Sequence, residues 1–193
     1  MIEVTYINHM GNDLSVVNAA RVSFAKESKW DDYDSEKDQY VLKDKDRKLI
    51  HYLAEHKHLS PFGHCFASFV VKAPIFVARQ LVKHKFLRWN EISRRYVDSE
   101  PQFYEPDEWR GKAKDKKQGS DGVVDVGDWG DTSWACLTAY KDLLAHGVCP
   151  EQARMVLPQN TMTEWYWSGS LDAFADMCNL RLKTDTQYET QLV

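Results

Sequence analysis

Proline and glycine are scarce in this chain of 193 residues, which has six prolines and nine glycines. Their scarcity excludes a collagen-like or linker-like polypeptide. No apolar run approaches the length of about 18 residues that a membrane-spanning helix needs. The amino terminus also lacks a basic stretch followed by a long apolar segment, so the sequence predicts neither a membrane anchor nor secretion.

Cysteine and the common catalytic signatures are equally sparse. The four cysteines, Cys65, Cys136, Cys149 and Cys178, form no C-x-x-C pair. We therefore expect a reduced, cytoplasmic chain with neither a zinc ribbon nor a disulfide framework. The sequence also lacks a phosphate-binding P-loop, a G-x-G-x-x-G dinucleotide fingerprint and a G-x-S-x-G nucleophile elbow. These absences argue against several common nucleotide-binding and hydrolase classes.

Four histidines lie close together in the sequence: His51, His56, His58 and His64. Their separations of five, two and six residues do not place two ligands on one helical face. No H-E-x-x-H motif is present either. We therefore predict no metal site and interpret these histidines as capping or surface residues.

Charge is unevenly distributed along the chain, although the formal net charge is only −4. The segment from Lys72 to Arg95 carries seven lysines and arginines and a single carboxylate, Glu91. Nucleic-acid binding usually requires a broadly basic face. An acidic protein with one basic segment is better suited to holding a small anion, so no nucleic-acid partner is expected.

The composition, 43% apolar and 28% charged, is that of a soluble globular protein, and the length favours one domain over residues 1–193. Residue patterns, β-branched and aromatic composition, and the positions of prolines predict strands at 2–7, 66–71 and 161–167, and helices at 15–22, 43–56, 75–84, 134–144, 153–157 and 171–181. The last helix is expected to bury Leu171, Phe174, Ala175 and Cys178. Glycines mixed with charges predict an exposed loop, which can be mobile, over residues 110–131. The fold class is therefore mixed α+β.

The most informative segment runs from Arg79 to Tyr96, where cations surround a helix end and the turn after it. A guanidinium at Arg95, beside the Ser93 hydroxyl, is suited to holding a phosphate. On charge alone, a solvated basic face or a nucleic-acid patch is an equally good interpretation, because Trp89 could stack on a base.

Two separated blocks of this sequence resemble the flavin-dependent thymidylate synthases. Lys83-His84-Lys85, followed seven residues later by Ser93, is similar to the R-H-R-x7-S signature of that family. The surroundings agree: S-P-F-G-H at 60–64, V-K-A-P-I-F-V-A-R-Q at 71–80 and N-E-I-S at 90–93. The second block is A-R-M-V-L-P-Q-N at 153–160, followed by N-L-R at 179–181. The resemblance extends from about residue 19 to 189, apart from the 110–131 loop.

The resemblance implies a twisted antiparallel sheet flanked by helices, and an enzyme of dTMP biosynthesis. That enzyme is a methyltransferase that converts dUMP to dTMP, with methylenetetrahydrofolate as carbon donor and NADPH-reduced FAD as hydride source. It also implies a homotetramer whose sites are shared between chains, as a 22.4 kDa chain can hardly enclose all these ligands alone.

The matching positions imply roles for individual residues. The catalytic residue is Arg181, which activates the uracil ring. The FAD-binding residues are Ser60, Lys83, His84, Lys85, Glu91, Ser170 and Asp176. The dUMP-binding residues are Gln80, Lys83, Glu91, Ser93, Arg94, Arg95, Arg154 and Arg181. No metal is implied.

Some positions depart from the family pattern. Both signature arginines are lysines here, Lys83 and Lys85, and Ser170 and Asp176 stand where flavin-contacting amides are common. Lysine keeps the positive charge but loses the planar fork of donors. We therefore expect FAD to bind less tightly and with a stronger dependence on salt.

Uracil is a poor carbon nucleophile, so the chemistry needs a cation that stabilises charge on its N3/O4 side. Arg181 lies three residues after Cys178, at the edge of the expected buried face, and can therefore point inward. Ser93 has no base at a supporting position and is better suited to binding than to nucleophilic attack. Two alternatives stay open: a related flavin-dependent pyrimidine nucleotide hydroxymethylase, and a non-catalytic binder of single-stranded nucleic acid.

Overall fold

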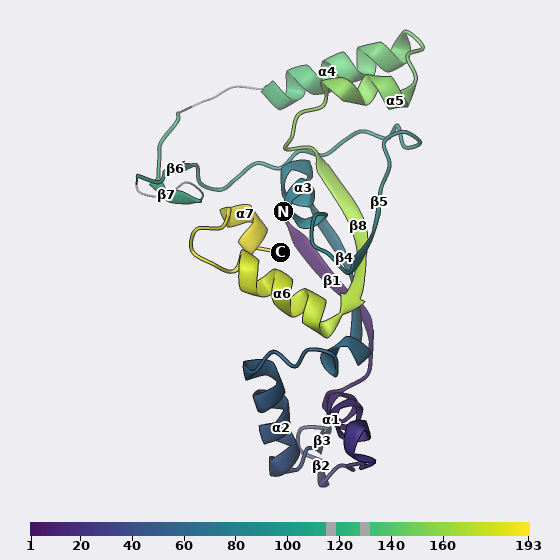
Figure 1. The fold of residues 1–193 in the computed structure, drawn as a ribbon. Coiled ribbons are helices and arrows are strands. Elements are labelled where there is room, and N and C mark those ends of the chain that lie inside the picture. Colours follow the sequence, from purple (N-terminus) through teal and green to yellow (C-terminus); the bar gives the residue numbers. More distant parts are fainter. Residues whose placement is uncertain (115–118, 128–131) are drawn as a thin grey trace.

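The centre of the molecule is a four-stranded antiparallel sheet with the strand order β1-β4-β8-β5 (Figure 1). This computed structural model describes residues 1–114, 119–127 and 132–193. The sheet strands are β1 (Glu3–Met10), β4 (Phe66–Pro74), β5 (Leu87–Glu91) and β8 (Met162–Ser170). The α+β class and the antiparallel sheet are therefore confirmed.

One face of the sheet is apolar because aromatic and β-branched residues alternate along its strands. Val71 lies opposite Trp165, and both Phe69 and Trp89 lie opposite Trp167. The Trp89 and Trp165 rings stack with their centroids 4.2 Å apart, and Trp165 is only 1% exposed. Replacing such a buried tryptophan by alanine costs about 3–5 kcal/mol, so this aromatic row is a main stabilising element of the fold.

Two helices cover this apolar face, and both follow directly from a sheet strand. Helix α3 (Ile75–Leu81) begins where β4 ends, and helix α6 (Leu171–Arg181) begins where β8 ends. Helix α3 buries Val77, Ala78 and Leu81 in the same core. Because both helices leave the sheet without a long connection, their orientation is fixed by the strands that precede them.

The predicted buried face of α6 is wrong. Leu171 is 46% exposed, and Ala175 and Cys178 are exposed as well, whereas Ala173 and Met177 are buried. Phe174 packs edge-on against Phe69 and Trp167 as expected. The exit of the chain from β8 sets the phase of the helix, and this phase is not visible in the apolar pattern. Ala173, Met177 and Arg181, spaced by four, share the inward stripe.

A small lobe lies at one end of the sheet, at the bottom of Figure 1. It consists of α1 (Asp13–Arg21), η1 (Val22–Phe24), the hairpin β2 (Asp32–Asp34) and β3 (Gln39–Val41), and α2 (Asp44–Glu55). Within it Asp46, which is fully buried, accepts hydrogen bonds from Arg21 and Ser28. Burial alone would raise the pKa of Asp46, but the bonds from Ser28 and Arg21, with the charge of Arg21, hold it below the ordinary value of 3.8.

A helical pair projects at the opposite end, at the top of Figure 1. It is formed by α4 (Thr132–Ala145), α5 (Pro150–Ala153) and η3 (Arg154–Val156). Tyr140 is buried there, but Trp134, which the helical spacing places on the same apolar stripe, is 66% exposed. The remaining elements are η2 (Phe62–His64), the hairpin β6 (Arg110–Lys112) and β7 (Ser120–Val123), and α7 (Tyr188–Gln191).

Residues 1–114, 119–127 and 132–193 contain neither a candidate membrane-spanning helix nor a candidate metal cluster. Within these ranges no helix has the length and apolar character to cross a membrane. In the same ranges no three His, Cys, Asp or Glu side chains are grouped so that they could hold a metal ion.

Candidate active site

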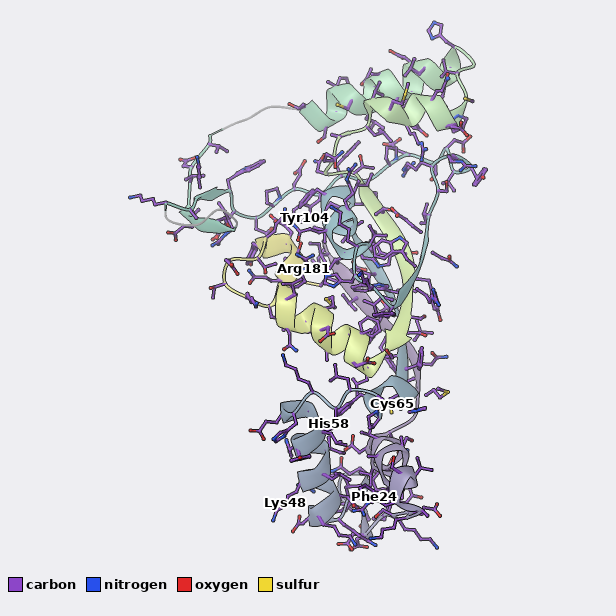
Figure 2. All side chains as sticks on the ribbon, in the orientation of Figure 1. Phe24, Lys48, His58, Cys65, Tyr104 and Arg181 are labelled. Carbon is purple, nitrogen blue, oxygen red and sulfur yellow. The ribbon has the colours of Figure 1, made fainter. Side chains whose placement is uncertain are left out.

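A cavity of about 920 Å³ lies between α3, the carboxyl end of α6 and the segment that follows α6. Its lining includes Gln80, Tyr104, Asn160, Arg181 and Tyr188. Figure 2 shows Tyr104 and Arg181 on this side of the sheet, far from Cys65 and His58 near the amino-terminal lobe. The volume is within the range of small-molecule sites, and polar and aromatic groups meet in it.

Arg181 is held inside this cavity by two contacts from α3 and the turn after it. Its Nε donates to His84 Nε2 at 2.9 Å, and its Nη2 donates to the backbone oxygen of Gln80 at 3.4 Å. Burial, and then the charge of Arg181, lower the pKa of His84 below the ordinary 6.5. A neutral imidazole has a free lone pair to accept the guanidinium proton, so the two observations agree.

Gln80 is fixed from the other side by the carboxyl-terminal segment. Its carboxamide Nε2 donates to Gln187 Oε1 at 2.9 Å, and its Oε1 accepts from the Thr190 hydroxyl at 2.9 Å. Three of the predicted site residues, Gln80, His84 and Arg181, are thus brought together within one chain. We call these three residues the α3–α6 cluster.

The hairpin β6–β7 forms part of the cavity wall. The Arg110 guanidinium carbon lies 5.0 Å from the centre of the Tyr188 ring, and Arg110 Nε donates to Ser120 Oγ at 2.7 Å. Gly119 has φ +81°, and a Cβ there would lie 2.8 Å from the backbone oxygen of Asp185, so only glycine fits this close approach. The described part of the predicted 110–131 loop is therefore a hairpin beside the cavity; 115–118 and 128–131 lie outside the described residues.

Sequence reasoning missed the aromatic wall of the cavity, which includes Tyr104 and Tyr188. Burial, followed by the nearby charge of Glu189, raises the pKa of Tyr104 above 10.0. The only signal in the sequence was the presence of Tyr104 and Trp109 just before the glycine-rich stretch. That signal does not distinguish a cavity wall from a core residue.

A second, smaller cleft of about 380 Å³ lies by the end of β5. Glu91, Arg94 and Arg154 line it. The Glu91 carboxylate accepts hydrogen bonds from Thr163 Oγ1 at 2.7 Å and from Trp89 Nε1 at 3.1 Å. Arg94 donates to the backbone oxygen of Ser99 at 2.7 Å.

Arg95 and Arg154 meet at one residue of α5. Arg95 Nε lies 3.6 Å from a carboxylate oxygen of Glu151, and Arg154 Nε donates to the backbone oxygen of Glu151 at 3.2 Å. The Arg95 backbone amide donates to Ser93 Oγ at 3.4 Å. Arg95 and Glu151 are about half exposed, and such pairs contribute little to stability. Glu91, Ser93, Arg94, Arg95 and Arg154 are called the β5–η3 cluster below.

The remaining predicted flavin residues do not join either cluster. Ser60 precedes η2, and Ser170 ends β8 next to it, because Leu171 donates its amide proton to the oxygen of Cys65. Asp176 is exposed on α6, and Lys83 and Lys85 are exposed in the turn after α3. The eight residue steps along β8 from Met162 to Ser170 span about 27 Å. One chain therefore holds the predicted residues at separate places.

Both the antiparallel sheet and the paired signature blocks are those of one family of enzymes. The family model described as "Thymidylate synthase complementing protein" matches residues 5–193. The chain therefore belongs to this family, the flavin-dependent thymidylate synthases, and the resemblance found in the sequence is confirmed.

Individual relatives agree with this assignment. A flavin-dependent thymidylate synthase of Thermus thermophilus is 39% identical over 96% of this chain and 66% of its own length. One from Kosmotoga olearia is 38% identical over 97% of this chain and 80% of its own length. The chain thus spans about two thirds of the Thermus relative. The structure of the UMP/dUMP methylase PolB from Streptomyces cacaoi, bound with 5-Br dUMP, superposes with a TM-score of 0.76 at 30% identity, covering 100% of this chain and 86% of that one.

Proposed function

We propose that this protein is a flavin-dependent thymidylate synthase that methylates dUMP reductively to dTMP. The observation that carries the proposal is Arg181, a cation held in the large cavity by His84 and by the backbone of Gln80. A charged side chain fixed in this way can act on a ligand without first reorganising. The names of the family relatives and of the PolB structure support the choice of reaction and of nucleotide.

The first chemical task is to make C5 of uracil nucleophilic. A cation on the N3/O4 side of the ring stabilises the negative charge that grows there as C5 attacks the one-carbon unit. Arg181 performs this task, because its planar guanidinium presents a positive charge and several N–H donors to that side of the ring. Neutral His84 accepts the Nε proton and so directs the remaining N–H groups.

The second task is to hold the nucleotide. Arg95 and Arg154, brought together by Glu151, bind its phosphate with the Ser93 hydroxyl. Glu91, whose carboxylate is oriented by Thr163 and Trp89, binds a donor of the nucleotide or flavin. Gln80 contacts the base, since it lines the same cavity as Arg181.

The flavin fits the cationic turn after α3. Lys83 and Lys85 are exposed, and among the ion pairs of the described residues neither takes part, so both ammonium groups are free to meet a diphosphate. Ser60, His84, Glu91, Ser170 and Asp176 complete the proposed FAD-binding set. When bound, the reduced flavin supplies the hydride that turns the methylene carried from methylenetetrahydrofolate into a methyl group, and NADPH restores it.

The wide separation of the predicted residues supports a homotetramer. Ser60 and Ser170 lie at one end of the sheet and the β5–η3 cluster at the other, so a site that uses both sets needs more than one copy of the chain. We expect Lys83, His84 and Lys85 to lie near residues of another chain. Sedimentation of the flavin-loaded protein should give a tetramer, and a monomer that still binds FAD would contradict this part of the proposal.

The absorbance spectrum of the purified protein, recorded with and without dUMP, tests the proposed function. A flavin band that changes when dUMP is added is the expected result. Mass analysis of the nucleotide product then separates methylation from hydroxymethylation. A colourless protein that binds no flavin, or a flavoprotein that leaves dUMP unchanged in the presence of NADPH and methylenetetrahydrofolate, would contradict the proposal.

A further inference from the structure

The carboxyl-terminal segment contributes two side chains that touch a predicted nucleotide-binding residue. Thr190 on α7 is 2% exposed, and its hydroxyl lies 2.9 Å from Gln80 Oε1. Gln187, the N-cap of α7, lies 2.9 Å from Gln80 Nε2 through its own Oε1. In Figure 1 α7 lies beside α3, next to the end of the chain. These two contacts join residues 107 and 110 positions apart in the sequence.

We propose that Gln187 and Thr190 are positioning residues that fix the orientation of the Gln80 carboxamide, that is, the directions of its oxygen and its nitrogen. This orientation makes the cavity select uracil over cytosine. The proposal rests on the proposed function, since it assumes that a pyrimidine nucleotide binds against Gln80. It assigns the carboxyl-terminal segment a part in substrate selection.

The selection follows from the hydrogen-bonding capacity of the carboxamide. A primary amide has two N–H donors and two lone pairs on its oxygen. Gln187 uses one donor and Thr190 uses one lone pair, which leaves one donor and one acceptor for a ligand. Uracil presents a carbonyl oxygen at position 4 beside an N3–H, whereas cytosine presents an amino group beside an unprotonated N3. Turning the amide by 180° would exchange its two ends and favour cytosine.

Thr190 opposes this turn because it is buried. After the turn its hydroxyl would face the Gln80 amino group and become an acceptor, and its own proton would lose the oxygen that now receives it. A buried donor without a partner is costly, by an amount equivalent to about a tenfold change in an equilibrium constant or more. Gln80 is also fixed at its backbone, where its carbonyl oxygen accepts from Arg181 Nη2 at 3.4 Å. The free ends of its amide therefore keep one direction.

Thr190→Val in the flavin-loaded full chain tests the proposal, since valine keeps the shape and removes the hydroxyl. We expect the Kd for dUMP to rise about five- to tenfold, and the preference for dUMP over dCMP to narrow by a similar factor. Turnover at saturating dUMP should change much less, because Arg181 is retained. Thr190→Ser should restore the preference. Gln191→Leu is the matched control: it removes α7 contacts to the backbone of Lys183 and Thr186 without touching Gln80, and should leave the preference unchanged.

A double-mutant cycle separates positioning from general loosening of the segment. In a Gln80→Leu background, Thr190→Val should produce no further change in dUMP or dCMP binding. If it weakens binding equally in both backgrounds, or if Gln191→Leu has the same effect, the inference is wrong. Should Thr190→Val fail to fold, Gln187→Leu at the partly exposed neighbour takes its place, with the same expected narrowing. Wild-type protein that binds neither nucleotide contradicts the proposed function itself, whereas wild type that prefers dUMP beside an unchanged variant contradicts this inference alone.

Discussion

The α3–α6 cluster and the β5–η3 cluster differ in how they hold their polar side chains in position. In the first, Arg181 and Gln80 are fixed by hydrogen bonds to one another and to His84, Gln187 and Thr190. In the second, Arg95 is held mainly by a half-exposed ion pair with Glu151 and a bond to Tyr96. The first cluster is preorganised within the chain, and the second is open to solvent.

The difference matches the chemistry assigned to each cluster. Charge that develops only during reaction is stabilised best by a group that does not need to move, in a site that excludes water. A phosphate carries its charge throughout, so exposed arginines that reorganise on binding serve it well enough. With the proposed roles, the fixed geometry lies where a transition state would be stabilised, and the exposed charge lies where a ground-state phosphate would be held.

Removing the guanidinium from the preorganised cluster should have the largest effect. Arg181→Ala is expected to lower kcat about a hundredfold or more, on the scale of an oxyanion-hole donor, because the contact matters most in the transition state. NADPH should still reduce the flavin, since that step does not involve the uracil ring. Stopped-flow flavin reduction beside steady-state turnover measures both. Normal methylation of dUMP by this variant at saturating substrate would remove Arg181 from the catalytic role.

Substitutions in the β5–η3 cluster should change KM for dUMP rather than kcat. Arg95→Ala and Arg154→Ala are each expected to raise the KM for dUMP about tenfold and to leave kcat nearly unchanged, because the phosphate contact is equal in ground and transition states. Steady-state kinetics over a range of dUMP concentrations gives the two parameters. A fall in kcat without a rise in KM would break the distinction between the two clusters.

Substitutions in the cationic turn after α3 should have a smaller effect, an increase in FAD affinity. Replacing Lys83 and Lys85 by arginine should tighten FAD binding severalfold and weaken its salt dependence, because a guanidinium adds a bidentate fork to the same charge. Titration of the apoprotein with FAD at low and high salt measures the effect. Lys183→Arg is a control for a guanidinium added elsewhere, since Lys183 lines the cavity that contains Arg181 and the two turn lysines do not. Equal or weaker binding by the double variant would contradict the expectation that lysine at these two positions weakens FAD binding.

The smallest expected effect is on kcat when the pH is lowered. The pKa of His84 is held below 6.5 by burial and by Arg181. The hydrogen bond from Arg181 Nε to His84 Nε2 is therefore intact above pH 6.5 and is lost as the pH falls through the folded-state pKa of His84. Protonated His84 cannot accept from Arg181 and repels it. The kcat should therefore fall severalfold on the acid side, with its midpoint below pH 6.5. His84→Asn, an acceptor that does not titrate, should remove this acid limb from the pH profile of kcat.

Much of the fold was predictable because its signals are local. β-Branched and aromatic residues marked the strand at 66–71, a strand was also predicted at 161–167, and helical spacing marked 43–56; the structure contains all three in slightly different bounds. The strand predicted at 2–7 exists as β1, but the apolar and polar alternation from which it was predicted suggests a half-buried strand, whereas β1 is an edge strand with exposed side chains. Alternation shows that a strand forms and cannot show how many neighbours it has.

The family and the candidate residues of its site could be predicted from the sequence alone, because the K-H-K-x7-S block, the second block at 153–160 and Arg181 are read directly from it. Only the tertiary structure decided what these residues touch. Arg181 meets His84 from 97 positions away, and Gln80 meets Thr190 from 110. The inward stripe of α6 was decided in the same way, by the exit of the chain from β8. Local periodicity specifies the elements, but the phase and pairing of elements depend on packing between distant parts of the chain, and that packing gives Arg181 and Gln80 their directions.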